Sequence, residues 1–239
     1  MRGINQVASA LWRRKLIALS FDDGPDEKTA EILALFAQYE ALGTFFVLGR
    51  QVKGREEVLR FAVKAGHELG NHTFSHPHLE TLEPAQIEDE LARASDAIEG
   101  AVGLQPRLMR PPYGFGALRA APVARRLGMK TVLWSLNPKD WSDSDPDRIS
   151  EAIVTGARPG AVVVLHDGAA HGGDRSPTVA ALRTAVPQLR DQGYRLVTVS
   201  TLLKRAPWAT RTAVPRGPFR RIVERVRRWV RANPGGSDE

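Results

Sequence analysis

The chain has 239 residues, of which 42% are hydrophobic and 26% charged, a composition typical of a globular protein that buries a sizeable core. It contains no cysteine, which excludes disulfides and thiolate metal sites, so any metal must be held by histidine and carboxylate. Every apolar run is far shorter than the about 20 residues that a transmembrane helix requires, which excludes such a helix.

The formal net charge of +7 belongs to one end of the chain. Residues 204–239 carry ten Lys or Arg against three acidic residues, a net of +7, so residues 1–203 sum to zero. The high net charge therefore does not indicate that the main domain binds nucleic acid, and we expect no nucleic-acid partner.

In chain order, short apolar runs alternate with longer segments of helical periodicity. We expect strands at 16–21, 43–48, 67–72, 107–110, 130–136, 160–166 and 194–199. We expect helices at 27–40, 51–65, 84–98, 117–127, 146–155 and 178–192, several of them followed by a glycine that ends the helical pattern. Seven strands separated by six helical crossovers imply parallel pairing and an α/β architecture.

The end of the chain has a different character from the rest. Residues 204–218 resemble a linker with three prolines, and residues 219–231 place apolar side chains along one face of a basic amphipathic helix. Such a helix either docks on the main domain or binds an anionic membrane surface. Residues 1–14 hold no apolar stretch of secretory length, so we expect either a cytoplasmic protein, peripheral at the membrane, or a shortened N-terminus.

The first expected strand ends in Ser-Phe-Asp-Asp-Gly-Pro at residues 20–25. Two adjacent ionised carboxylates, Asp22 and Asp23, repel each other, so a site that holds both needs a cation. An isolated match of this kind is more often a solvated turn, because Asp, Gly and Pro are common turn residues.

A second motif, Gly-Asn-His-Thr-Phe-Ser-His-Pro at residues 70–77, carries two histidines four residues apart. This spacing places His72 and His76 on one side of a helical turn, from which both imidazoles can hold one metal. With one carboxylate from the first motif, the ligand set becomes two histidines and one aspartate with room for water. Such an open site of nitrogen and oxygen ligands suits zinc or a similar divalent ion.

Three more polar groups follow expected strands. Arg110 precedes Pro-Pro-Tyr-Gly, Asp140 and Trp141 follow the strand-like segment 131–134, and His166 ends the apolar run 161–165. In a parallel barrel the functional groups gather where the strands end, so these residues are expected to converge with the first two motifs on one rim.

Taken in order, the five motifs resemble the motif set of the polysaccharide deacetylases, the NodB-homology domains of carbohydrate esterase family four. The resemblance covers residues 15–203, with 1–14 as a lead-in and 204–239 as a basic extension. It implies a distorted, incomplete (β/α) barrel of about seven strands. The sequence departs from the pattern at Asn137, where many members carry another acidic residue.

Hydrolytic chemistry and the resemblance assign the same roles to the rim residues. Asp23, His72 and His76 are expected to bind the metal, zinc being favoured and cobalt, nickel or manganese being alternatives. Asp22 is expected to act as the general base and His166 as the general acid.

The resemblance also supplies the partners of these groups. It implies that Arg110 pairs with Asp22, that Asp140 pairs with His166, and that the backbone N–H of Tyr113 stabilises an oxyanion. Trp141 is expected to wall the pocket and stack on a sugar. The remaining histidines, at 67, 78 and 171, are expected to be structural or solvated.

The predicted function is metal-dependent removal of an N-acetyl group from an amino sugar in an oligosaccharide, polysaccharide or glycolipid. A deformylase or cyclic amidase of the same fold, and a non-catalytic carbohydrate-binding or membrane-associated protein, are alternatives. A two-histidine-one-carboxylate iron oxygenase is disfavoured, because it would not need an acid and a base beside the metal.

Overall fold

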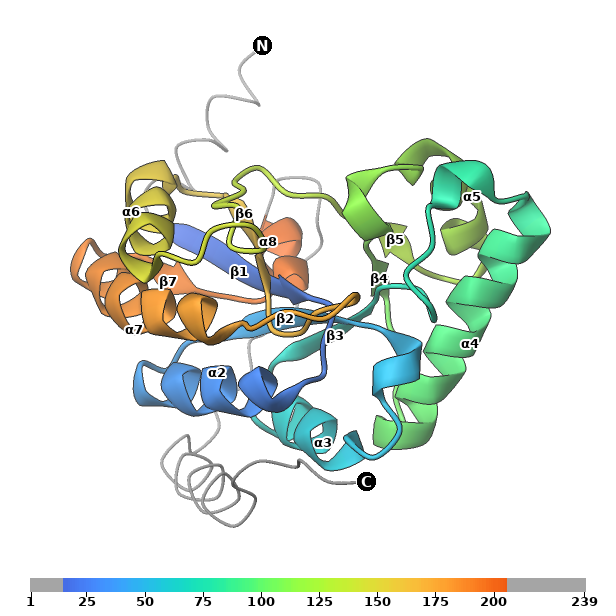
Figure 1. Cartoon of the computed structure of the whole chain (residues 1–239), viewed down its shortest axis with the longest axis horizontal. Helices are drawn as coiled ribbons and strands as arrows, with labels where there is room; N and C mark the ends of the chain where they lie inside the picture. The colour runs from blue at the N-terminus through green and yellow to red at the C-terminus, as the bar shows by residue number, and fades with distance from the viewer. Residues whose placement is uncertain (1–14, 206–239) are drawn as a thin grey trace.

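The computed structural model describes residues 15–205. The predicted lead-in 1–14 and the predicted amphipathic helix at 219–231 lie outside the described residues. Within the described range, strands alternate with helices along the whole chain, as the periodicity predicts (Figure 1). None of the helices in this range is long and apolar enough to cross a membrane.

All the strands of the described region belong to one parallel sheet of order β5-β4-β3-β2-β1-β6, and β7 pairs with the first residues of β1. The strands are β1 (Leu16–Asp22), β2 (Gly43–Val47), β3 (Glu68–Asn71), β4 (Leu108–Met109), β5 (Lys130–Thr131), β6 (Val162–His166) and β7 (Arg195–Leu196). The chain beyond β5 curls back to β6, where Leu136 forms a bridge with Val163. The sheet is therefore a distorted half-barrel, which confirms the predicted fold class.

The central strand β1 fixes the position of the site. All seven of its residues are buried, as expected for a strand of a parallel sheet covered on both faces. Its last residue, Asp22, lies in register with Phe46 of β2 and with His166 of β6. The register thus brings the first and last predicted catalytic residues to neighbouring strand ends.

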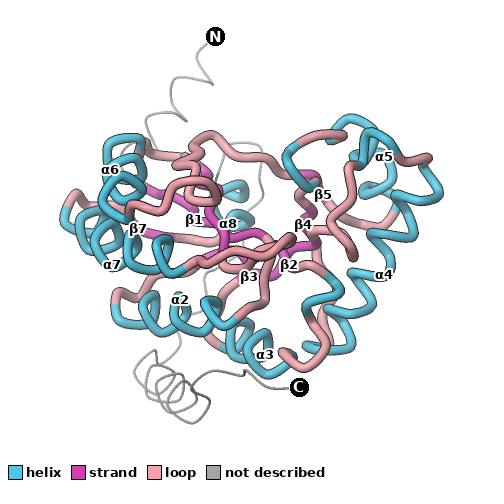
Figure 2. Tube along the Cα trace, in the orientation of Figure 1, coloured by secondary structure: helices cyan, strands magenta, loops and turns pink. Residues whose placement is uncertain are grey.

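Helices cover the outside of the curled sheet (Figure 2). They are α2 (Glu27–Gln38), α3 (Glu56–Lys64), α4 (Pro84–Val102), α5 (Ala117–Arg126), α6 (Pro146–Gly156), α7 (Ser176–Asp191) and α8 (Val199–Arg205), with 3₁₀ turns η1 (Gly49–Gln51), η2 (Leu79–Thr81) and η3 (Pro112–Gly114). In Figure 1, α2, α6 and α7 lie at the left of the sheet, and α4 and α5 at the right. The largest core cluster contains Phe21, Phe36 and Phe45, and the rings of Phe21 and Phe45 stack at 5.0 Å.

Three predicted elements are shorter than the sequence pattern indicates. The strand expected at 130–136 stops at Thr131, the strand expected at 194–199 is only Arg195–Leu196, and the helix expected at 51–65 begins at Glu56. Gly54, with a φ of 81°, interrupts the last of these. The Thr198 hydroxyl accepts a hydrogen bond from the Thr201 N–H at 3.2 Å and begins α8, which periodicity did not predict.

Candidate active site

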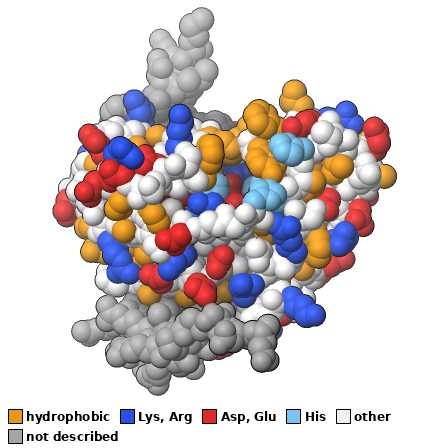
Figure 3. All heavy atoms as spheres, viewed as in Figure 1, with side chains coloured by type: hydrophobic (Ala, Val, Ile, Leu, Met, Phe, Trp, Pro, Cys, Tyr) orange, Lys and Arg blue, Asp and Glu red, His pale blue; other side chains and the backbone are white. Residues whose placement is uncertain are grey.

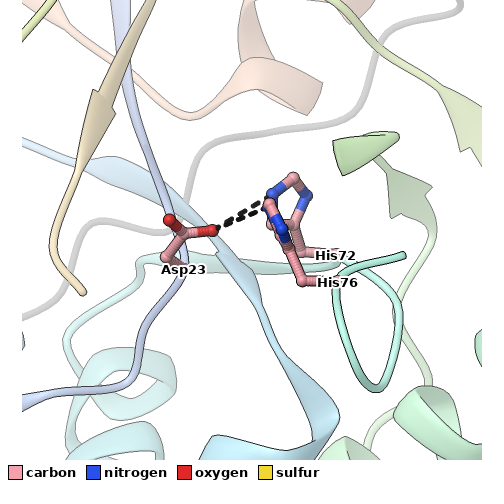
Figure 4. Close-up of side chains that lie close together, drawn as sticks. All are labelled: Asp23, His72 and His76. Carbon is pink, nitrogen blue, oxygen red and sulfur yellow. Dashed lines mark ion pairs between the residues drawn. The ribbon is translucent and has the colours of Figure 1, made fainter. Parts of the chain in front are cut away.

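Three predicted metal ligands lie together at the carboxyl ends of β1 and β3. Asp23 Oδ1 lies 3.2 Å from His76 Nε2 and 3.4 Å from His72 Nε2, and all three side chains are buried (Figure 4). The potential ligand atoms of the three residues all lie within 4.8 Å of one another. The structure therefore brings together the set that the sequence predicts.

The hydrogen bonding of Asp23 fits a cation. Its Oδ2 accepts a hydrogen bond from the Ala170 N–H at 3.3 Å, whereas its buried Oδ1, which faces the two imidazoles, has no hydrogen-bond partner. Burial raises the pKa of Asp23, but His72 and His76 outweigh burial and hold that pKa below its usual range. An ionised oxygen left unpaired beside two imidazoles is suited to a divalent metal.

The loop that carries the two histidines differs from the prediction. Residues 72–76 form no helical turn, because Thr73 and His76 have left-handed φ values of 71° and 67°. The imidazoles converge because the backbone turns sharply between them. His72 Nδ1 lies 2.8 Å from the Arg110 carbonyl oxygen, which requires the proton on Nδ1 and leaves Nε2 free to bind a metal.

The two adjacent aspartates have different partners. Asp23 has a φ of 73°, so the chain turns immediately after β1. Asp22 Oδ1 accepts a hydrogen bond from Arg110 Nη1 at 2.7 Å, and Asp22 Oδ2 lies 3.9 Å from His72 Nε2. The predicted pair of Asp22 and Arg110 is therefore present, next to the predicted metal ligands.

Arg110 is fully buried, which is unusual for a charged side chain. Its Nη2 donates to Ser20 Oγ at 2.9 Å, and its guanidinium lies 4.1 Å from the Phe46 ring and 5.7 Å from the Trp134 ring. Burial lowers the pKa of Arg110 and Asp22 opposes this effect, but an arginine remains protonated in proteins. The site thus contains a fixed positive charge against Asp22.

The second predicted pair is also formed. His166 Nδ1 lies 2.9 Å from Asp140 Oδ1, and Asp140 Oδ2 accepts from the His166 backbone N–H at 2.8 Å and from Thr178 Oγ1 at 2.9 Å. Burial lowers the pKa of His166, but the hydrogen bond and charge of Asp140 outweigh burial, so the pKa is raised. His166 is therefore oriented through Nδ1, and its Nε2 remains available to a ligand.

Tyr113 and Trp141 lie differently with respect to these groups. Tyr113 has a φ of 59° in η3, and its ring packs edge-on against His76 at 4.5 Å, so it belongs to the site. Trp141 directly follows Asp140 and is 55% exposed. The exposure leaves the ring free to meet a ligand.

Two contacts of Tyr113 with histidines could not be predicted from the sequence. The His78 ring stacks on the Tyr113 ring at 4.1 Å, and the Tyr113 hydroxyl lies 2.7 Å from His171 Nε2. Both histidines were expected to be solvated loop residues. Tyr113 thus connects the loops that follow β3, β4 and β6, a relation between distant segments that spacing in the sequence cannot reveal.

Asp167 is a further buried acid that the sequence analysis missed. Its Oδ2 accepts a hydrogen bond from the Thr29 hydroxyl, and its Oδ1 has no partner. Burial raises the pKa of Asp167 to about 7, although the Thr29 hydrogen bond opposes the shift. Its position directly after His166 was visible in the sequence, but its burial was not.

On the face shown in Figure 3, histidine and hydrophobic side chains border a hollow in the surface, and charged side chains are visible inside it. The exposed hydrophobic residues of the described region include Tyr113, Phe115, Leu118, Leu133 and Trp141. A polar floor with an apolar border is typical of a site for a small ligand or for one part of a longer chain.

Comparisons with known proteins agree with the fold and identify the family. The family model described as polysaccharide deacetylase matches residues 12–132. The peptidoglycan-N-acetylglucosamine deacetylase of Bacillus cereus is 40% identical over 193 residues, which cover 80% of this chain and 89% of the relative. The chitooligosaccharide deacetylase of a Bradyrhizobium species is 38% identical over 190 residues, which cover 75% and 87%.

A solved structure gives the same result. The peptidoglycan deacetylase PdaC from Bacillus subtilis matches with a TM-score of 0.73 at 32% sequence identity, covering 94% of this chain and 98% of that chain. The family model spans half of the sequence, and both relatives are matched over most of their length. The chain therefore belongs to the polysaccharide deacetylase family of hydrolases.

Proposed function

We propose that this protein is a metal-dependent deacetylase that removes N-acetyl groups from amino sugars in a peptidoglycan-type or chitooligosaccharide-type glycan. The observation that carries the proposal is the arrangement of two separately paired catalytic groups around one candidate metal site. Asp22 is paired with Arg110, His166 is paired with Asp140, and both flank the Asp23 cluster. The choice of glycan is supported by the names of the two relatives.

The ligand set fits a divalent metal ion. Two imidazole nitrogens and one carboxylate oxygen, with no thiolate, suit zinc, and cobalt, nickel or manganese can use the same ligands. When bound at Asp23, His72 and His76, such an ion would lower the pKa of a water molecule and polarise the acyl oxygen.

The remaining residues supply proton transfer. We assign Asp22 as the general base, because its carboxylate lies beside the candidate metal ligands and is held in place by Arg110, where it can accept a proton from water. We assign His166 as the general acid, because Asp140 favours the protonated imidazole that can donate a proton to the departing amine. Proton transfer of this kind contributes about a hundredfold to ten-thousandfold in rate.

Two groups are assigned to substrate and transition state. The Tyr113 backbone N–H is the proposed oxyanion donor, supported by the position of this residue in a tight turn against His76. Trp141 is the proposed sugar platform, supported by its exposure next to Asp140. A deformylase or cyclic amidase would use the same acid and base, so the choice of an N-acetyl glycan rests on the relatives. A non-catalytic protein would not need these paired groups.

The test is acetate release by metal-depleted protein that has been reconstituted with zinc, cobalt, nickel or manganese. The substrates are chitin oligomers, peptidoglycan fragments and an amino-sugar glycolipid. We expect metal-dependent acetate release from at least one of them, and its loss in Asp22→Asn. Asp89→Asn, which changes an exposed acid paired with Arg93, serves as the control. Release that persists after chelation, or in Asp22→Asn, contradicts the mechanism.

A further inference from the structure

A buried carboxylate on α4 takes no part in the proposed chemistry. Glu90 is only 9% exposed, although glutamate is rarely buried without a partner. Its Oε2 accepts hydrogen bonds from the backbone N–H groups of Phe74 at 2.9 Å and Ser75 at 2.8 Å, and its Oε1 accepts from Ser75 Oγ at 2.8 Å. All three donors lie between His72 and His76 in the chain. One side chain of α4 therefore holds the centre of the metal-ligand loop.

The opposite side of this loop is held by η1. The Thr73 carbonyl accepts a hydrogen bond from the Gly49 N–H at 3.0 Å, and the Phe74 carbonyl accepts one from the Arg50 N–H at 3.1 Å. A Cβ atom on Gly49 would lie 2.6 Å from the Phe74 ring and 2.8 Å from Ala94 Cα. Glycine therefore allows η1, the loop and α4 to pack closely against one another.

The start of the loop is also connected to α4. Asn71 Oδ1 accepts a hydrogen bond from the Thr73 N–H at 2.8 Å, and Asn71 Nδ2 donates to the Leu91 carbonyl at 2.8 Å and to Ser95 Oγ at 3.0 Å. Neutral groups thus fix the beginning of the loop, and the carboxylate of Glu90 fixes its centre.

The loop needs this support because its backbone is strained. Thr73 and His76 adopt left-handed φ values, which are strained for residues other than glycine and persist only where surrounding contacts hold them. Two successive N–H groups that face one acceptor form a concave site for an anion, and hydrogen bonds to a carboxylate are about twice as strong as neutral ones. With three donors directed at it, this position is suited to a carboxylate side chain.

We propose that Glu90 is a positioning residue for the metal site. It holds residues 74–75 so that His72 and His76 direct their Nε2 atoms to one point before an ion arrives. The inference rests on the proposed function, because it concerns the same metal ligands, but it makes a separate claim about the metal-free loop. Loss of a group that orients metal ligands lowers metal affinity by about 10–100-fold.

The test compares Glu90→Ala and Glu90→Gln in the full chain with Glu88→Gln, which changes an exposed acid on the same helix that is paired with Arg126. Zinc affinity is measured by competition with a chromophoric chelator, and exchange of the Phe74 and Ser75 amides is measured in the metal-free protein. For Glu90→Ala we expect zinc affinity to fall about 10–100-fold and both amides to exchange faster. Glu90→Gln keeps an acceptor oxygen and the shape of the side chain but loses the charge, so its zinc affinity should fall several-fold. The zinc affinity of Glu88→Gln should equal that of the parent.

If Glu90 had only a structural role, its substitution would lower thermal stability and leave the zinc affinity of the folded protein unchanged. Glu68→Gln provides that comparison, because Glu68 accepts hydrogen bonds from Thr44 and Ser200 away from the metal ligands. Folded Glu90→Ala with parental zinc affinity overturns the proposal. If Glu90→Ala does not fold, the test rests on Glu90→Gln. A zinc affinity of Glu90→Gln equal to that of the parent also overturns the proposal. If the parent protein binds none of zinc, cobalt, nickel and manganese, the proposed function fails, and parental amide exchange in the Glu90 variants then overturns this inference separately.

Discussion

Arg110 lies completely buried with its Nη1 atom 2.7 Å from Asp22 Oδ1, so the protein itself neutralises one of the two adjacent aspartates. The other, Asp23, faces only imidazoles through an oxygen that has no hydrogen-bond partner. Two neighbouring carboxylates of the same chemistry thereby obtain different functions. One keeps a permanent cationic partner and can accept a proton, and the other is left for a metal ion.

The first prediction separates the base from the metal ligands. Asp22→Asn should reduce kcat by about a hundredfold or more, because an amide cannot accept the proton that a general base removes. Zinc affinity should remain close to that of the parent, because Asp23, His72 and His76 are unchanged and the amide oxygen can still accept from Arg110. Steady-state kinetics and chelator competition on the same sample measure both quantities. Near-parental kcat would show that Asp22 is not the base.

The second prediction concerns the metal. His72→Ala should lose zinc binding under conditions in which the parent is saturated, because the site then keeps only one imidazole and one carboxylate. The matched control is His78→Ala, since His78 is exposed and contacts Tyr113 instead of Asp23. Metal content after dialysis measures the difference. Equal zinc retention in the parent and in His72→Ala would contradict the assigned ligand set.

The third prediction follows from the Asp140 contact with His166. A general acid works only while protonated, so the rate falls as the pH rises through the pKa of His166, which Asp140 raises against the effect of burial. Asp140→Asn removes the charge and lowers that pKa. The alkaline limb of kcat/KM should therefore move to lower pH, and the activity loss should be larger at about pH 8 than at about pH 6. An alkaline limb at the parental position would refute the pairing.

The convergence of the motifs could be predicted from the sequence because it depends on topology. Asp22 follows one expected strand and His166 ends another, and parallel strands end on the same side of a sheet, so their convergence on one rim was predicted. The pairing of β1 with β6, which places Asp22 in register with His166, came only from the structure. The pairs Arg110–Asp22 and Asp140–His166 came from the family resemblance, and the structure contains both.

The path of the backbone between the motifs could not be predicted in the same way. The left-handed conformations of Thr73 and His76 oppose local preference. They are held by hydrogen bonds that the loop donates to Glu90 and accepts from η1, both of which lie elsewhere in the sequence. The apolar residues after Thr131 predict a continued strand, yet Trp134 packs on Arg110 and is not part of a strand. A hydrophobic pattern indicates which residues are buried, but it does not indicate which backbone groups form hydrogen bonds with one another.

The fourth prediction concerns stability and Asp167. Its folded pKa, about 7, is raised above that of an unfolded aspartate, so the protonated form stabilises the fold and this contribution is lost as the pH rises through about 7. Asp167→Asn cannot ionise, so its thermal stability relative to the parent should increase between about pH 5 and pH 8 in metal-free protein. Calorimetry at both pH values measures the effect, with exposed Asp89→Asn as the control. A stability difference that does not change with pH would contradict the raised pKa.

The fifth prediction concerns the basic extension beyond Arg205, which lies outside the described residues and remains a prediction from sequence. Residues 206–239 carry eight arginines and three acidic residues, and removing them leaves α8 complete at Arg205. The truncated protein should no longer pellet with anionic vesicles, and the parent should be released by salt, because apolar burial and charge attraction act together at a lipid surface. Activity on a soluble chitin oligomer should be retained, since every assigned site residue lies between 22 and 166.

Replacing Trp229 by alanine should weaken pelleting without changing the charge, which separates the apolar contribution from the electrostatic one. Unchanged pelleting of the truncated protein would eliminate the membrane role and favour a helix that docks on the barrel.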